Sequence, residues 1–218
     1  MTYEAVKRAM DLAIACLAAV VVLPLMAVIA VVIRLDSRGP ALLRQTRVGR
    51  HGEDFELLKF RTMVVGAHAM GSGWLVAERD PRITRVGHFL RRWSLDELPQ
   101  LFNVLRGDMS IIGPRPTLRY QVDQYTDFQR RRLEVRPGIT GWAQVQGRND
   151  LPWPARIELD VHYVEHRSLR LDLEILRRTV RVLATPSGIY NEARGDWGET
   201  TDPAGHAEPA KDAPPETV

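Results

Sequence analysis

The sequence predicts an α+β protein, with an N-terminal re-entrant membrane helix, a small β-hairpin and several amphipathic or interfacial helices around a compact cytosolic domain. Three observations lead to this prediction. Residues 12–33 form an apolar block without a charge. Two short runs between residues 41 and 60 flank a glycine-containing turn, which is typical of a hairpin. Apolar residues then recur at helical spacing in several stretches up to residue 184.

Composition limits the class of protein. The chain has 218 residues and one cysteine, Cys16, which excludes a disulfide-framed module and a cysteine-based zinc site. The net charge of +3 hides an asymmetry, because residues 191–218 carry seven acidic and two basic residues and leave +8 on the rest. A basic body suits an anionic partner. We divide the chain into a membrane-inserted segment at 1–35, a folded domain at 36–190 and a disordered acidic tail at 191–218.

The apolar block is long enough to cross a membrane, yet its flanks favour a helix that returns to the same side. Its 22 uncharged residues exceed the roughly 20 that a bilayer core needs. Lys7 and Arg8 precede the block, and Arg34 and Arg38 follow it, so both ends carry the charge that favours the cytoplasmic face. Pro24 kinks or breaks the helix near its centre. We therefore prefer a re-entrant helical hairpin over a spanning helix or the buried helix of a soluble protein.

Turn residues and apolar spacing predict the remaining elements. We expect strands at 41–45 and 55–60, a loop at 66–82, and helices at 84–93, 95–106, 117–134, 157–166 and 172–184. The helix at 117–134 ends in three arginines, which predict a solvated face or a contact with anionic lipid headgroups.

The densest group of chemically useful residues follows Arg91. Ser94 and Glu97 have the spacing of a capping box, which predicts a helix start here. The N-cap is either Ser94 or Asp96, and either choice leaves Asp96 in the first turn. There the free N–H groups and the helix dipole keep a carboxylate ionised. Two adjacent carboxylates after two arginines suit phosphoryl transfer. An ionised carboxylate can attack phosphorus, and arginines with a divalent metal such as Mg²⁺ neutralise the moving charge.

Three further segments present a cation. Arg115 stands between two prolines, Arg136 precedes a proline and two glycines, and Lys59 opens a Lys-Phe-Arg run. Rigidly presented cations suit phosphate binding. The six histidines are scattered, and the basic residues are interleaved with turns, so we predict neither a zinc site nor nucleic-acid binding.

In this order, the segments resemble the bacterial sugar transferase family, the monotopic polyprenyl-phosphate phosphoglycosyl transferases, in their minimal catalytic form. The resemblance covers about residues 4–184. The matching motifs are Lys7-Arg8-x-x-Asp11, Leu35-Asp36-Ser37-x-Gly39-Pro40, Arg47-Val48-Gly49, Lys59-Phe60-Arg61-Thr62-Met63, Leu95-Asp96-Glu97-Leu98-Pro99-Gln100-Leu101-x-Asn103-Val104, Gly107-Asp108-Met109-Ser110-x-Ile112-Gly113-Pro114-Arg115-Pro116 and Arg136-Pro137-Gly138-Ile139-Thr140-Gly141.

The resemblance implies a reaction. Such enzymes transfer a sugar-1-phosphate from a UDP-sugar to undecaprenyl phosphate and release UMP, the initiating step of exopolysaccharide, capsule or O-antigen assembly. By this resemblance Asp96 is the nucleophile and carries an aspartyl phospho-sugar intermediate. Glu97 is its partner as a metal ligand or proton acceptor, and Mg²⁺ is the cofactor at Asp96 and Glu97.

The resemblance also implies the rest of the site and its setting. Arg91 and Arg115 match phosphate-binding positions, and Lys59 and Arg136 match more weakly. The partners are the UDP-sugar donor, the undecaprenyl phosphate acceptor and membrane lipids. The location is the bacterial inner (cytoplasmic) membrane, with the catalytic domain at 36–190 on the cytoplasmic face.

The chain departs from the family pattern in places. Leu23-Pro24 stands where many small members have Ser-Pro, and the acidic tail matches no family motif. Two other functions are a non-catalytic, membrane-anchored scaffold of polysaccharide assembly and a polyprenyl-phosphate hydrolase. The intact Asp96-Glu97 pair and Arg115 argue against the scaffold.

Overall fold

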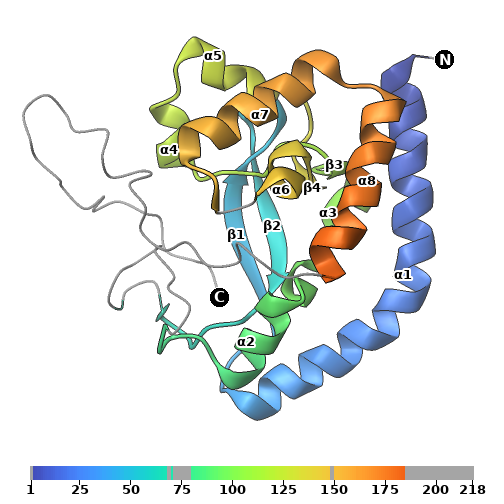
Figure 1. Cartoon of the computed structure of the whole chain (residues 1–218). Coiled ribbons are helices and arrows are strands. Elements are labelled where there is room, and N and C mark those ends of the chain that lie inside the picture. Colours follow the sequence, from blue (N-terminus) through green and yellow to red (C-terminus); the bar gives the residue numbers. More distant parts are fainter. Residues whose placement is uncertain (1, 68–69, 71–79, 148–149, 185–218) are drawn as a thin grey trace, which may run out of the picture.

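The fold is a mixed arrangement of helices and small sheets beside one long N-terminal helix (Figure 1). The computed structural model describes residues 2–67, 70, 80–147 and 150–184. A two-stranded antiparallel sheet and a two-stranded parallel pair lie among the helices, so the predicted α+β class is confirmed. The predicted acidic tail and most of the predicted loop at 66–82 lie outside the described residues.

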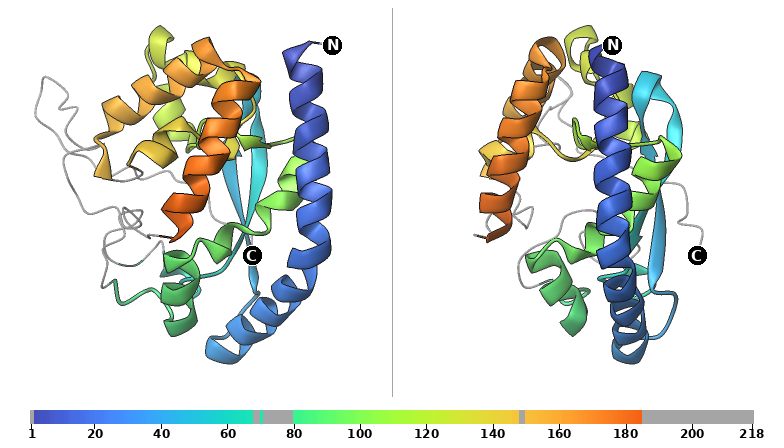
Figure 2. Two further views of the ribbon diagram at one scale, coloured as in Figure 1. Left: turned by 45° about the vertical axis from the view of Figure 1, so that its right-hand side comes forward. Right: turned by 90° about the vertical axis from the view of Figure 1, so that its right-hand side faces the viewer.

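Helix α1 (Tyr3–Asp36) is continuous and bends along its length (Figures 1 and 2). The helix does not break at Pro24, because proline removes one backbone donor while the bonds on either side persist. Its length and composition suit a membrane, and only 17% of its most apolar 18-residue window is buried. Leu17 is 73% exposed, Val20 74% and Leu35 82%. An exposed apolar face of this kind marks a contact with a membrane or with another protein, and with so little of the window buried the core helix of a soluble protein does not fit.

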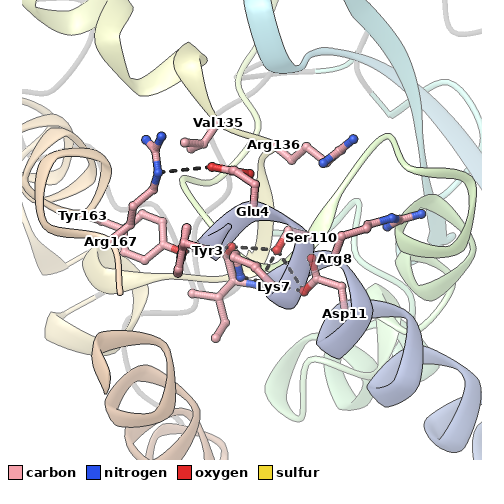
Figure 3. Close-up of a pocket in the computed structure, with 11 residues that line it drawn as sticks. Tyr3, Glu4, Lys7, Arg8, Asp11, Ser110, Val135, Arg136, Tyr163 and Arg167 are labelled. Carbon is pink, nitrogen blue, oxygen red and sulfur yellow. Dashed lines mark hydrogen bonds and ion pairs between the residues drawn. The ribbon is translucent and has the colours of Figure 1, made fainter. Parts of the chain in front are cut away.

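The N-terminal half of α1 is held by a buried polar network (Figure 3). Asp11 is 4% exposed, and its Oδ1 accepts from the Ser110 hydroxyl and the Ile111 N–H, both at 3.0 Å. The Lys7 Nζ lies 3.4 Å from Asp172 Oδ2 and 3.8 Å from Asp11 Oδ1. Lys7 and Asp11 therefore dock the helix onto the folded domain.

Arg8 extends the same contact to α3 (Gln100–Arg106). Its guanidinium donates to the carbonyls of Val104 at 2.8 Å and Leu105 at 3.2 Å, in the last turn of that helix. Carbonyls at a helix C-terminus lack full intrahelical pairing and attract cations. The charge of Arg8 is thus directed at the protein.

The C-terminal end of α1 is held by Arg61, at the end of the hairpin. Arg61 is 5% exposed, and its guanidinium donates to the four successive carbonyls of residues 37–40 at 2.6–3.3 Å. The Asp36 Oδ2 also accepts from the Val86 N–H at 3.2 Å, where α2 (Arg85–Arg92) begins. Both ends of α1 therefore contact one folded domain.

The hairpin consists of β1 (Leu42–Val48) and β2 (Asp54–Phe60), which pair antiparallel with Leu42 opposite Phe60. The short helix η1 (Arg50–Gly52) joins them, with His51 in the left-handed region. The predicted hairpin is confirmed. β1 runs three residues further than predicted because Val48, 1% exposed, packs in the core with α7 (Trp153–His166).

A second, parallel strand pair was not predicted, because three residues carry too little periodicity to identify a strand. It consists of β3 (Ser110–Ile112) and β4 (Gly138–Thr140). Two glycines permit the close approach, since a Cβ on Gly138 would lie 2.1 Å from the Gly113 nitrogen. The chain then continues through α6 (Trp142–Gln146), α7 and α8 (Leu169–Ala184). The helices predicted at 84–93, 157–166 and 172–184 are confirmed.

The single helix predicted at 117–134 is wrong. The structure has α4 (Arg119–Asp123), α5 (Asp127–Arg130) and η4 (Arg131–Glu134) instead. Thr126 starts a new helix, since its hydroxyl accepts from Gln129 N–H while the Gln129 amide accepts from Thr126 N–H. In the triple arginine, Arg132 is 3% exposed, so this residue belongs neither to a solvated face nor to a lipid contact.

We expect Asp11→Ala to lower the free energy of unfolding by roughly 3 kcal/mol, because the buried Ile111 N–H loses its acceptor and Lys7 keeps only one of its two carboxylate partners, Asp172. Denaturant unfolding in detergent measures this change. Asp123→Ala is the matched control: it removes an exposed carboxylate and should change stability by less than about 0.5 kcal/mol. A stability of Asp11→Ala equal to that of the wild type would show that this network does not hold α1.

Candidate active site

The two adjacent carboxylates lie in η3 (Leu95–Glu97), a short turn between α2 and α3. The predicted capping box does not form, because the Ser94 side chain makes no cap hydrogen bond and its φ of 54° is left-handed. Helix α3 begins only after Pro99, which occupies its N-cap. Asp96 therefore does not lie in the first turn of a helix over 95–106. The sharp turn at Ser94 presents Asp96 and Glu97 instead.

Glu97 and Arg115 join two motifs that are separate in the sequence. The Arg115 guanidinium donates to both Glu97 carboxylate oxygens, at 2.5 and 3.4 Å. Its side chain is 54% exposed and that of Glu97 is 19% exposed, so the pair lies at the surface of a cavity. The Glu97 carboxylate raises the pKa of Arg115. The forked contact fixes the guanidinium plane and leaves its outer edge accessible.

Asp96 is half-buried among charges of both signs. Burial first, and then the Glu97 carboxylate, raise the pKa of Asp96 to about 6. Lys59, Arg91 and Arg115 act in the opposite direction. At neutral pH most Asp96 carboxyl groups are therefore ionised. The two carboxylates and three cations leave a net charge of +1, which favours a phosphate anion.

Three residues at or just after the end of β2 have different roles. Lys59 lies in the charged cluster around Asp96, whereas Arg61 holds the end of α1. Thr62 is 3% exposed, and its hydroxyl accepts from Arg91 Nε at 2.8 Å. The Lys-Phe-Arg-Thr run thus connects the site with the membrane helix.

Arg136 is not brought together with these residues. Its Nε donates to the Gly107 carbonyl at 2.8 Å, and it lines a small pocket beside the N-terminal end of α1 (Figure 3). The proline and glycines after Arg136 pack backbone against backbone, since a Cβ on Gly113 would lie 2.4 Å from the Arg136 carbonyl. An arginine next to proline therefore presents a cation at Arg115 but belongs to a strand contact at Arg136.

A buried network behind Arg115 was missed by the sequence interpretation. The Arg132 guanidinium donates to the Arg115 carbonyl at 2.9 Å, to the Tyr125 hydroxyl at 2.6 Å and to Asp160. Arg132 therefore fixes the backbone that carries Arg115. One signal was available: Asp160 falls on the buried face of α7 between Ile157 and Val161, and a buried acid requires a partner.

One cavity of about 1550 Å³ contains the charged cluster and extends to apolar walls. Lys59, Arg91, Asp96, Glu97 and Arg115 all line it. The apolar lining includes residues of the two helices with exposed apolar faces, Ala18 and Val22 of α1 and Val182 and Leu183 of α8. A ligand with a charged head and an apolar tail fits such a cavity.

The acidic pair suits a magnesium ion by its chemistry. Within the described residues no group of three or more histidine, cysteine, aspartate or glutamate side chains could hold a metal. Mg²⁺ takes one or two carboxylates together with waters and substrate phosphates. Asp96 and Glu97 therefore fit Mg²⁺ in a phosphate complex and do not fit an all-protein metal cage.

Comparison with known proteins identifies the class as a sugar transferase. The family model described as bacterial sugar transferase matches residues 2–186. The chain belongs to the bacterial sugar transferase family, and the predicted enzyme class, a phosphoglycosyl transferase, is confirmed.

Three relatives have names that match this family. An uncharacterized sugar transferase, EpsL of Bacillus subtilis, is 45% identical over 84% of this chain and 89% of its own length. The UDP-glucose:undecaprenyl-phosphate glucose-1-phosphate transferase of Caulobacter vibrioides is 44% identical over 84% and 72%. The UDP-N-acetylgalactosamine-undecaprenyl-phosphate N-acetylgalactosaminephosphotransferase of Aeromonas hydrophila is 43% identical over 85% of this chain, which spans 45% of that protein.

We expect Arg132→Lys to lower kcat/KM of the transferase reaction about 10-fold, roughly 1.4 kcal/mol, because lysine retains the charge beside Asp160 but loses the forked contacts. In an Arg115→Met background the same change should cost less than about 2-fold, since contacting residues are not additive. Arg130→Lys, at an exposed neighbour, should leave the rate unchanged. Independent, multiplicative losses at Arg132 and Arg115 would exclude a role of Arg132 through Arg115.

Proposed function

We propose that this enzyme transfers a sugar-1-phosphate from a UDP-sugar to undecaprenyl phosphate and releases UMP, the initiating step of exopolysaccharide, capsule or O-antigen assembly. The observation that carries the proposal is that one cavity holds a carboxylate pair among three cations and continues along apolar residues of α1 and α8. The Caulobacter and Aeromonas relatives are named for this type of reaction. A scaffold would have no need of the charged cluster.

The reaction proceeds in two displacements at one phosphorus. An Asp96 carboxylate oxygen attacks the phosphorus that bears the sugar, and the bond from that phosphorus to the UMP oxygen breaks, so UMP leaves with the electron pair. A phosphate oxygen of undecaprenyl phosphate then attacks the same phosphorus and displaces Asp96. The product is undecaprenyl diphosphate sugar. The aspartyl phospho-sugar intermediate lets two large substrates use the cavity in turn.

The cations and Glu97 have separate tasks in this scheme. Arg91, held by Thr62, and Arg115, held by Glu97, bind the phosphate oxygens whose charge grows in the transition state. Lys59 supports the same charge from β2. Bound at Asp96 and Glu97, Mg²⁺ would neutralise phosphate charge and stabilise the departing UMP.

The setting we propose is the cytoplasmic membrane, with α1 re-entrant and the catalytic domain on the cytoplasmic face. The support is the docking of both ends of α1 onto one domain through Asp11 and Arg61. A helix held in this way lies shallowly in one leaflet with its exposed apolar face in lipid. The charged cluster then lies at headgroup level, where a lipid-bound phosphate meets a water-soluble sugar nucleotide.

We expect the purified protein in nanodiscs to release UMP from one or more of a panel of UDP-sugars when Mg²⁺ and undecaprenyl phosphate are present. Asp96→Asn should reduce the rate at least about 10³-fold, because an amide is a poor nucleophile. Asp123→Asn, at an exposed carboxylate, is the control and should retain full activity. UMP release that persists in Asp96→Asn would exclude Asp96 as the nucleophile, and turnover of undecaprenyl phosphate without a sugar nucleotide would indicate the hydrolase.

A further inference from the structure

The wall of the large cavity contains buried polar atoms without a partner among the described residues. Gln144, on α6, has both amide atoms, Nε2 and Oε1, buried and without a hydrogen bond. Asp160, on α7, accepts a hydrogen bond from Arg132 at Oδ2, while its Oδ1 is buried and makes no hydrogen bond. Both residues line the cavity that holds Asp96.

An unused buried amide is costly for the folded protein. Each unsatisfied buried donor or acceptor lowers the stability of the folded state, and native proteins leave few of them. The backbone also leaves room for this amide, because a Cβ on Gly141 would lie 2.8 Å from Gln144 Oε1. Methionine at position 144 would fill a similar volume without this cost. We therefore expect the amide to form its hydrogen bonds with a bound ligand.

The chemistry of the amide selects between the two substrates of the proposed reaction. Gln144 offers a donor and an acceptor side by side, and Asp160 adds a second acceptor. The polyprenyl acceptor presents hydrocarbon and a phosphate monoester that is mostly dianionic at neutral pH, so it offers almost only acceptors. A UDP-sugar presents donors and acceptors together, in the imide edge of uracil and in the hydroxyl or acetamido groups of the sugar.

We propose that Gln144, with Asp160 Oδ1 on the wall of the same cavity, forms a subsite that binds the UDP-sugar donor by paired hydrogen bonds to its uracil or its sugar. This inference rests on the proposed function. Gln144 is a binding residue for the donor and takes no part in the displacement at phosphorus. Removal of the amide should therefore stabilise the protein without ligand and weaken the binding of the UDP-sugar.

The test is Gln144→Met in the full-length protein in nanodiscs, with the UDP-sugar that the wild type turns over. We expect an increase of about 10-fold in KM for that donor, an unchanged KM for undecaprenyl phosphate, and a melting temperature equal to or above that of the wild type. Gln146→Met is the matched control, because Gln146 lies on the same helix, is exposed and contacts Arg178. It should leave both KM values unchanged.

Inhibition by UMP then locates the contact on the donor. A weaker inhibition of Gln144→Met by UMP assigns the amide to the uracil, and an unchanged inhibition with a raised donor KM assigns it to the sugar. Gln144→Glu keeps the length of the side chain, removes the donor group and should also raise the donor KM. An unchanged donor KM in both variants, or a lowered melting temperature with a loss confined to kcat, would overturn the subsite. A wild type that releases no UMP from any donor would contradict the proposed function itself.

Discussion

The constraint on which the rest of the structure depends is that one folded domain holds both ends of α1. Near the N-terminal end of α1, Asp11 accepts hydrogen bonds from Ser110 and Ile111. Just after the C-terminal end of α1, Arg61 donates to the carbonyls of residues 37–40. The helix between these contacts packs one face on the domain and leaves its other face apolar and exposed. The position of the charged cluster relative to the exposed apolar face of α1 is therefore set by side-chain contacts at two places.

The same contacts connect the membrane helix to the chemistry. Arg61 lies next to Thr62, which orients Arg91, and two residues after Lys59, which faces Asp96. On the other side Arg132 holds the backbone of Arg115. The charges around Asp96 nearly balance, so the carboxylate stays ionised at neutral pH while the cations still attract a phosphate. Substitutions that disturb α1 should therefore affect catalysis as well as membrane binding.

Local patterns in the sequence predicted much of this arrangement, and long-range pairing accounts for what they missed. Apolar spacing identified α1, the hairpin, α7 and α8, and the adjacent carboxylates with presented cations pointed to Asp96, Glu97 and Arg115. No local pattern shows that Arg132 turns inward to Asp160, or that Arg136 faces Gly107 rather than phosphate. The capping box at Ser94 failed because Glu97 pairs with Arg115, 18 residues away. Gln144 carries no motif, and only its buried, unpartnered amide reveals it.

The most direct test of the constraint on α1 is the side of the membrane on which each end lies. In a Cys16→Ser background, which removes the single cysteine, Thr2→Cys and Arg38→Cys place a thiol at exposed positions beside each end of the helix. A membrane-impermeant maleimide is then applied to inside-out and right-side-out membrane vesicles. The contacts at both ends of α1 predict that both thiols react in inside-out vesicles only. Labelling of the two thiols from opposite faces would show that α1 spans the membrane and would contradict the docking of both ends onto one domain.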